Sequence, residues 1–172
     1  MGLIYITGVA GSGKSAICKT LLELGHEAHE GDDTLSAFYN NVSGKKVNRP
    51  LLAADRTPKW RSEHTWKMSR DGLLELKERA QSKPIFVCGV ASNEDEYIDV
   101  FDRVFALVID ENTLIERIKN RGSEGFGQSP HELKTLMEWQ RSSKDYYKKI
   151  GAHTIDATRP IEQVAKALIA AI

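Results

Sequence analysis

Eight residues near the start of the chain have the types and the spacing of a phosphate-binding loop. The stretch Gly8-Val9-Ala10-Gly11-Ser12-Gly13-Lys14-Ser15 fits the pattern of glycine, four residues, glycine, lysine, and serine or threonine. Backbone N–H groups that surround a polyphosphate need backbone angles that glycine reaches at little cost. Lys14 would supply positive charge to the outer phosphates, and the Ser15 hydroxyl would ligate Mg²⁺. The residues predicted to bind the polyphosphate here are Gly8, Gly11, Ser12, Gly13, Lys14 and Ser15.

The stretches on either side of this loop predict the strand and the helix that position it. Residues 3–7 are apolar and β-prone, as expected of a buried strand. Residues 16–24 predict a helix whose apolar face includes Ile17 and Leu21. The start of this helix would present unpaired N–H groups and the positive end of its dipole to an anion.

Two carboxylates follow the next predicted strand, residues 26–30. Asp32 and Asp33 come directly after Gly31. Ligands of open parallel sheets bind at the carboxyl ends of the strands, so both side chains are expected at the same edge as the phosphate loop. We predict that one of them accepts the proton of an attacking hydroxyl or contacts the acceptor, and that Asp32 also serves Mg²⁺. The alternative for Asp33 is the N-cap of a helix predicted over 34–39.

A third group of candidate residues lies in the polar stretch that follows. Arg56, Trp60 and His64 would line a pocket for the phosphoryl acceptor, because an aromatic face with a cation suits a base, a sugar ring or an acid. A helix is predicted from 60 to about 81, with Trp60 and His64 four residues apart on one face. The alternative is a tryptophan packed in the core beside a surface histidine.

Two arginines and a glycine-rich stretch predict a lid over the bound phosphates. Arg117 and Arg121 are four residues apart at the end of a helix predicted over 112–120, so they share a face. The residues 122–129 contain three glycines and no apolar pattern. A lid there would keep water from the reacting phosphoryl group. The alternative is an exposed connector with solvated arginines.

Strands and helices alternate along the chain, which indicates an α/β fold with a parallel sheet. Further strands are predicted over 84–90, 104–109 and 153–155, and further helices over 131–149 and 161–172. We expect one domain over 1–172, with an acceptor-binding insertion at about 34–81 and the lid at about 121–130.

The composition narrows the function classes. The chain has 172 residues, with 24 Lys plus Arg against 24 Asp plus Glu, so nothing in its charge favours nucleic acid or an anionic membrane as the main partner. No apolar run has the length of a transmembrane helix. Cys18 and Cys88 are expected to be buried thiols in a reducing cytoplasm, and the protein to be a monomer or homodimer.

With these motifs placed, the chain resembles the small P-loop kinases, a group that includes nucleoside monophosphate, shikimate and gluconate kinases. The resemblance implies a three-layer P-loop fold with a five-stranded parallel sheet flanked by helices, a short lid, and ATP with Mg²⁺. It implies that Arg117 stacks on adenine and that Arg121 contacts phosphate and acts in catalysis. It also implies that the turn with Ala157, Thr158 and Arg159 lies against adenine.

Two stretches are most similar to gluconate kinases: Gly31-Asp32-Asp33, and Asp55-Arg56-Thr57-Pro58-Lys59-Trp60. The chain differs from that group in lacking His-Pro after Asp33. It also has no acidic residue directly after the predicted strand that ends at Cys88-Gly89, where nucleotide kinases often carry one. Magnesium binding would then depend on Ser15, water, and Asp32 or Asp33.

The leading hypothesis is therefore ATP-dependent phosphoryl transfer to a small molecule, at a hydroxyl of a sugar acid, polyol or nucleoside. A nucleoside monophosphate kinase is the next. A nucleotide-hydrolysing switch or partner-binding module is the alternative from another class, although the guanine-reading sequence Asn-Lys-x-Asp is absent. A polynucleotide-end kinase is disfavoured by the neutral charge and the missing basic stripe.

Overall fold

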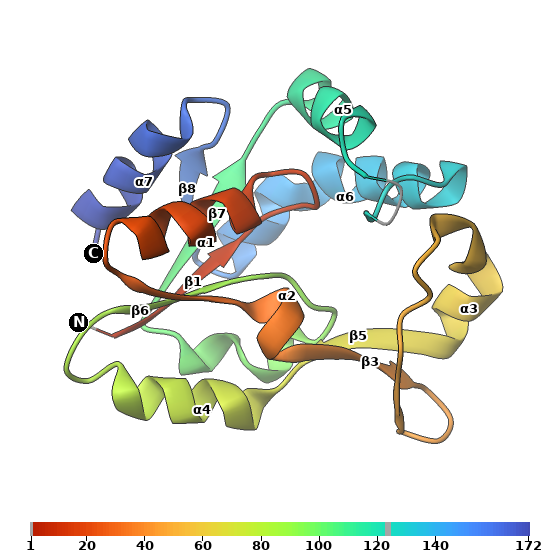
Figure 1. Ribbon diagram of the computed structural model, residues 1–172, viewed down its shortest axis with the longest axis horizontal. Helices are drawn as coiled ribbons and strands as arrows, with labels where there is room; N and C mark the ends of the chain where they lie inside the picture. The colour runs from red at the N-terminus through yellow and green to blue at the C-terminus, as the bar shows by residue number, and fades with distance from the viewer. Residues whose placement is uncertain (1, 123–124) are drawn as a thin grey trace.

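The computed structural model describes residues 2–122 and 125–172, and its centre is a parallel sheet of five strands (Figure 1). The strand order is β2-β6-β1-β7-β8, and every neighbouring pair is parallel. The strands are β1 (Leu3–Thr7), β2 (Glu27–Glu30), β6 (Ile85–Cys88), β7 (Arg103–Val108) and β8 (His153–Asp156). The predicted α/β fold with a five-stranded parallel sheet is confirmed.

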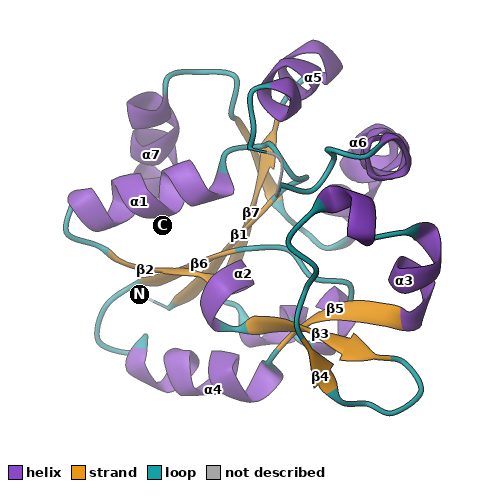
Figure 2. Ribbon diagram, turned by 45° about the vertical axis from the view of Figure 1, so that its right-hand side comes forward, coloured by secondary structure: helices purple, strands orange, loops and turns teal. Residues whose placement is uncertain are grey.

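Helices lie on both faces of this sheet and make three layers (Figure 2). Successive side chains of a strand point to opposite faces. On β1, Ile4 and Ile6 therefore belong to the apolar cluster beneath α1 (Lys14–Glu23) and α7 (Ile161–Ala170), whereas Leu3 and Tyr5 belong to the cluster beneath α4 (Arg70–Arg79). The main helices are α1 (Lys14–Glu23), α4 (Arg70–Arg79), α5 (Glu111–Lys119), α6 (Pro130–Lys149) and α7 (Ile161–Ala170).

Side-chain caps define where several helices begin. Asp110 accepts a hydrogen bond from the Thr113 amide at the start of α5. Ser129 caps α6 in the same way, and Pro130 occupies its first turn, where a missing N–H costs nothing. The predicted helices after the phosphate loop, over 112–120, over 131–149 and at the C-terminal end are confirmed to within two or three residues.

The segment between α1 and α4 differs from its prediction. The short helix α2 (Gly31–Thr34) leads into β3 (Ser36–Asn40), β4 (Lys46–Val47), the 3₁₀ turn η1 (Ala53–Asp55), α3 (Pro58–Glu63) and β5 (His64–Met68). These strands form a second, antiparallel sheet in the order β4-β3-β5. The helix predicted over 34–39 is therefore wrong, and so is the continuous helix over 60–81.

The physical reason is a cross-strand aromatic pair. Phe38 on β3 lies opposite Trp66 on β5, with ring centroids 4.7 Å apart. Aromatic pairs stabilise antiparallel strands, and this pairing needs the alternation of a strand. Residues four apart, such as His64 and Met68, share a face in a helix and also in a strand, so their spacing did not discriminate between the two.

The remaining elements are two 3₁₀ turns between β6 and β7, η2 (Glu94–Glu96) and η3 (Ile98–Val100). Cys18 and Cys88 are both buried thiols, as predicted. None of the helices in the described residues combines the length and apolar character that crossing a membrane requires.

Candidate functional site

The phosphate loop connects the end of β1 to the start of α1. Gly11 and Gly13 adopt φ of 90° and 105°, in the left-handed region that favours glycine. A Cβ placed on Gly8 would lie 2.5 Å from Ser12 Oγ and 2.9 Å from the Leu107 carbonyl oxygen. The backbone of this loop therefore requires glycine at its first position and in its turn.

Lys14 folds back over the loop that precedes it. Its side chain is buried, and Nζ donates to the carbonyl oxygens of Gly8 at 2.7 Å and Val9 at 3.2 Å. Burial lowers the pKa of Lys14, the negative charge of Asp32 opposes this effect, and the positive charge of Arg121 adds to it. The ammonium group is thus held at the loop without a carboxylate bonded to it.

Two hydroxyls of the loop remain available to a ligand. Ser12 Oγ is buried and has no hydrogen-bond partner among the described residues, which is an unusual state for a buried polar atom. Ser15 is exposed in the first turn of α1. An unpartnered hydroxyl, glycine amides and a helix N-terminus make a suitable set of groups for an anion.

Asp32 lies at the same edge of the sheet, as predicted from strand topology. Its Oδ1 accepts a hydrogen bond from the Val90 amide at 3.1 Å, just beyond the end of β6. The Asp32 charge acts on the pKa of both Lys14 and Arg121. The carboxylate is only half-buried, so it remains partly accessible to a ligand.

Asp33 is exposed, and it occupies the first turn of α2 together with Asp32. The alternative that Asp33 caps a helix over 34–39 is wrong, because β3 occupies that stretch. Glu30 is the residue before α2, and no side chain caps this helix.

Arg117 joins the phosphate loop to the turn after β8. Nη1 donates to the Ser12 carbonyl at 3.1 Å, and Nη2 donates to the Ala157 carbonyl at 2.8 Å. Arg159 extends from the same turn and pairs with Asp156 at 3.2 Å, with both side chains exposed. The structure thus brings together the residues that the resemblance placed around adenine.

Arg121 lies two residues beyond the C-terminal end of α5, and its guanidinium makes no hydrogen bond with the described residues. Partial desolvation lowers its pKa, Asp32 raises it, and Arg49 lowers it further. Its side chain packs on Gly125, where an added Cβ would lie 3.3 Å from Nε. Residues 123 and 124 of the predicted lid lie outside the described residues.

Arg56 occupies a different environment from the one predicted for an acceptor-binding residue. It is 1% exposed and forms a buried ion pair with Glu132, with Nε 2.8 Å from Oε1. Burial by itself would raise the pKa of Glu132, but the hydrogen bond and charge of Arg56, the Gly127 amide and Arg61 bring it below its ordinary value.

Trp60 and His64 pack against one another and against the second sheet. Their rings stack at 4.6 Å, and Trp60 meets Phe38 edge-on at 4.8 Å. His64 Nδ1 lies 2.7 Å from the Trp60 carbonyl oxygen. On the same face of the sheet, Trp66 Nε1 donates to the Val90 carbonyl at 2.9 Å, so this aromatic face is linked through Val90 to Asp32.

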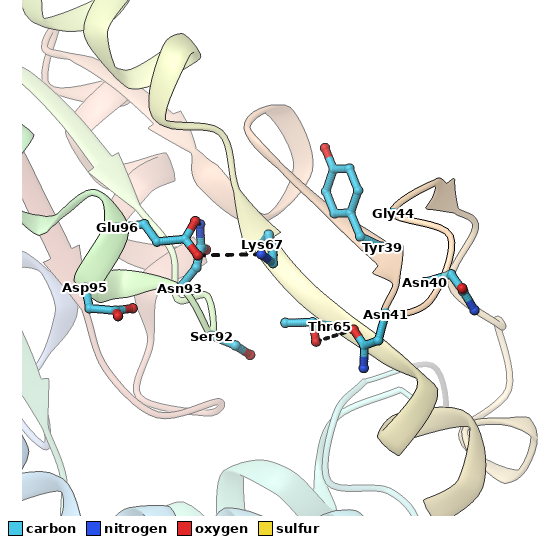
Figure 3. Close-up of a pocket in the computed structure, with 10 residues that line it drawn as sticks. All are labelled: Tyr39, Asn40, Asn41, Gly44, Thr65, Lys67, Ser92, Asn93, Asp95 and Glu96. Atoms are coloured by element: carbon cyan, nitrogen blue, oxygen red, sulfur yellow. Dashed lines mark hydrogen bonds and ion pairs between the residues drawn. The ribbon is translucent and has the colours of Figure 1, made fainter.

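A pocket of about 560 Å³ lies on the other face of the second sheet (Figure 3). Thr65 and Lys67 point into it, and they alternate along β5 with Trp66. The facing wall is the segment Ser92 to Glu96, and an ion pair of 3.5 Å joins Lys67 to Glu96. No residue of the phosphate loop lines this pocket.

Three charged residues of this region were not among the sequence-predicted site residues. Arg61 lies with its guanidinium carbon 4.3 Å from the centre of the Phe126 ring. Glu132 lies in the first turn of α6. Glu94, six residues beyond Cys88, accepts hydrogen bonds from Tyr5 Oη at 2.6 Å and Thr7 Oγ1 at 3.1 Å.

Only one of these residues left a signal in the sequence. Glu94 lies six residues beyond the end of β6, whereas an acidic residue was considered only at the position directly after that strand. The sequence around Arg61 and Glu132 reads as an ordinary solvated helix surface.

This fold and site define a P-loop protein, and the sequence also matches the model of a protein family. A family model described as an AAA domain matches residues 4–135, which is most of the chain, so the protein belongs to that family. Its fold is that of the small P-loop kinases, as the resemblance predicted. No curated protein matches the sequence.

Solved structures of small-molecule kinases have the same fold. The chain is 16% identical to a shikimate kinase from Acinetobacter baumannii in complex with shikimate, over 98% of this chain and 91% of that one, with a TM-score of 0.61. It is 17% identical to a deoxyadenosine kinase from M. mycoides with bound dATP, over 99% of this chain and 98% of that one, with a TM-score of 0.57. It is 21% identical to a gluconokinase from Sinorhizobium meliloti, over 96% of this chain and 87% of that one, with a TM-score of 0.53.

Proposed function

We propose that this protein transfers a phosphoryl group from ATP to a hydroxyl of a small molecule. The observation that carries the proposal is the position of Asp32 at the sheet edge that carries the phosphate loop, where its Oδ1 accepts a hydrogen bond from the Val90 amide and its charge acts on Lys14 and on Arg121. A carboxylate at that place is suited to orient or deprotonate an acceptor hydroxyl next to the terminal phosphate.

The roles of the other residues follow from phosphoryl transfer, which depends on positioning and charge stabilisation. Lys14 exchanges its carbonyl partners for phosphate oxygens, and Ser12 Oγ donates to the same group. Arg121 neutralises charge on the transferring group. Arg117, already bonded to the loop and to Ala157, holds the nucleotide together with Arg159.

The residues near the loop fit a Mg²⁺ ion that is shared with the nucleotide. No group of three or more His, Cys, Asp or Glu side chains in the described part of the chain could hold a metal by itself. Mg²⁺ is commonly bound through one or two protein oxygens, water and substrate phosphates. Ser15 and Asp32 would supply the protein oxygens here, and the ion would neutralise phosphate charge.

The acceptor site lies, in this proposal, between Asp32 and the aromatic face of the 34–81 insertion. The Arg61 guanidinium forms one hydrogen bond to a described residue, Glu132, so its other donors are free to meet an anionic group. Asp33 and the Trp60–His64 pair would complete the wall. A sugar acid is the leading acceptor, and a nucleoside monophosphate is the second candidate. The protein would act in the cytoplasm, with 121–130 as its lid.

The test is a screen of ATP consumption with gluconate, sorbitol, shikimate, adenosine and AMP as acceptors, repeated for the best acceptor with Asp32→Asn. We expect one acceptor to stimulate turnover, and Asp32→Asn to lower kcat by roughly a hundredfold or more because general base catalysis contributes that much. ATP turnover that none of these acceptors accelerates would favour a nucleotide-driven switch instead.

A further inference from the structure

The buried ion pair of Arg56 and Glu132 has no part in the proposed chemistry, although it lies beside the site. The two residues are 76 positions apart in the sequence, and each is 1% exposed. A buried charged pair is costly to form unless its remaining hydrogen-bonding groups are also satisfied. The partners of both side chains therefore indicate what the pair holds together.

Every N–H group of the Arg56 guanidinium has an acceptor within the protein. Nε and Nη2 donate to Glu132, Nη1 donates to the carbonyls of Pro50 at 3.1 Å and Leu51 at 3.0 Å, and Nη2 also donates to the Gly125 carbonyl at 2.9 Å. These bonds use all five donors of an arginine. Arg56 thus has no donor left for an acceptor molecule and acts on the protein itself.

Both carboxylate oxygens of Glu132 also accept hydrogen bonds from residues other than Arg56. Oε1 also accepts from Arg61 Nη2 at 3.1 Å, and Oε2 also accepts from the Gly127 amide at 3.1 Å. A further bond joins the His131 side chain to the backbone of the other segment, because His131 Nε2 lies 2.8 Å from the Arg56 carbonyl oxygen. The segments 50–61 and 125–132 are therefore joined by several bonds that converge on one carboxylate and one guanidinium.

This network reaches the proposed site at two points. Gly125, which accepts from Arg56, is the residue on which the Arg121 side chain packs. The ring of Phe126, the next residue, packs against the Arg61 guanidinium, whose central carbon lies 4.3 Å from the ring centre. One arginine proposed for the nucleotide side and one proposed for the acceptor side thus rest on the same short stretch.

We propose that Arg56 and Glu132 are positioning residues that make 50–61 and 125–132 one cooperative unit. This inference rests on the proposed function in one respect, which is that Arg121 contacts the nucleotide. When the nucleotide fixes 125–132, it also orders the acceptor segment, so an acceptor that binds next has a smaller ordering cost. Nucleotide and acceptor then bind with positive cooperativity although they need not touch.

The first test uses hydrogen exchange of the full chain without ligand. In the wild type we expect the amides of 50–61 and 125–132 to exchange with a common opening equilibrium, as residues of one cooperative unit do. Arg56→Lys keeps the charge beside Glu132, but its single nitrogen cannot reach the carbonyls of Pro50, Leu51 and Gly125 together. We expect 50–61 to exchange about tenfold faster in this variant, and 125–132 to change less.

The second test adds Mg²⁺ and adenylyl imidodiphosphate, an ATP analogue that resists transfer. In the wild type both segments gain protection, and in Arg56→Lys only 125–132 does. Lys59→Gln is the matched control, because Lys59 belongs to the segment 50–61 but pairs on the surface with Glu63, at 3.9 Å, and not with Glu132. It should behave as the wild type. Glu132→Gln, a variant of the same shape, gives the same test if Arg56→Lys does not fold.

Separate exchange behaviour of the two segments in the unliganded wild type would overturn the proposal. So would protection of 50–61 by the analogue that persists in Arg56→Lys and Glu132→Gln. A failure of the proposed function looks different, because then no acceptor is phosphorylated while the common opening in the unliganded protein remains.

Discussion

The phosphate loop and the Arg56–Glu132 network are two ways of placing positive charge beside the proposed phosphoryl-transfer site. Lys14 in the loop is held only by carbonyl oxygens and lies near an unpartnered Ser12 hydroxyl. Arg56 has every donor bonded and a carboxylate as its partner. The first arrangement is incomplete until an anion arrives, whereas the second is complete in itself. Unused hydrogen-bonding groups therefore distinguish a side chain that can bind a ligand from one that only holds the structure together.

The largest expected effect is the loss of stability in Glu132→Ala. This change leaves Arg56 buried without its carboxylate, and breaking a buried pair from one side costs about 3–5 kcal/mol. The free energy of unfolding from urea titration measures it. A loss below about 1 kcal/mol would mean that water or another acceptor replaces the carboxylate easily.

The phosphate loop should give the opposite result. Lys14→Ala is expected to leave the free energy of unfolding nearly unchanged and to lower phosphoryl transfer by roughly a hundred- to a thousandfold, the size seen when one charge-stabilising donor is removed. Steady-state kinetics with the best acceptor and a urea titration of the same variant measure both quantities. Normal turnover would refute the assignment of the loop.

A smaller effect is expected from acid. The folded pKa of Glu132 lies below the ordinary carboxyl value, so its ionised form stabilises the folded state above that value, and this contribution is lost as the pH falls through the lowered folded pKa. Between the folded and the unfolded pKa of Glu132, the unfolded state binds more protons, so the free energy of unfolding rises with pH. The melting temperature of Glu132→Gln should therefore depend less on pH in this acid range than that of the wild type. Equal slopes would show that other carboxylates control the acid transition.

Sequence patterns within single elements predicted much of this molecule correctly. The glycines, Lys14 and Ser15 specify the loop because an anion-binding backbone requires those residue types at that spacing. The apolar strands specify the parallel sheet, and the sheet topology in turn predicted that Asp32 would lie at the edge where the loop lies. Each inference needed only local spacing or a rule about strand ends.

The second sheet and the charged network were decided by contacts between distant residues. A spacing of four residues fits a helix and a strand equally, and the pairing of Phe38 with Trp66 chose the strand. Arg56 resembles a ligand-binding arginine in sequence, and its role depends on Glu132, 76 positions away. A side chain's charge and reach are properties of its residue type, but its free donors depend on which neighbours the fold brings to it.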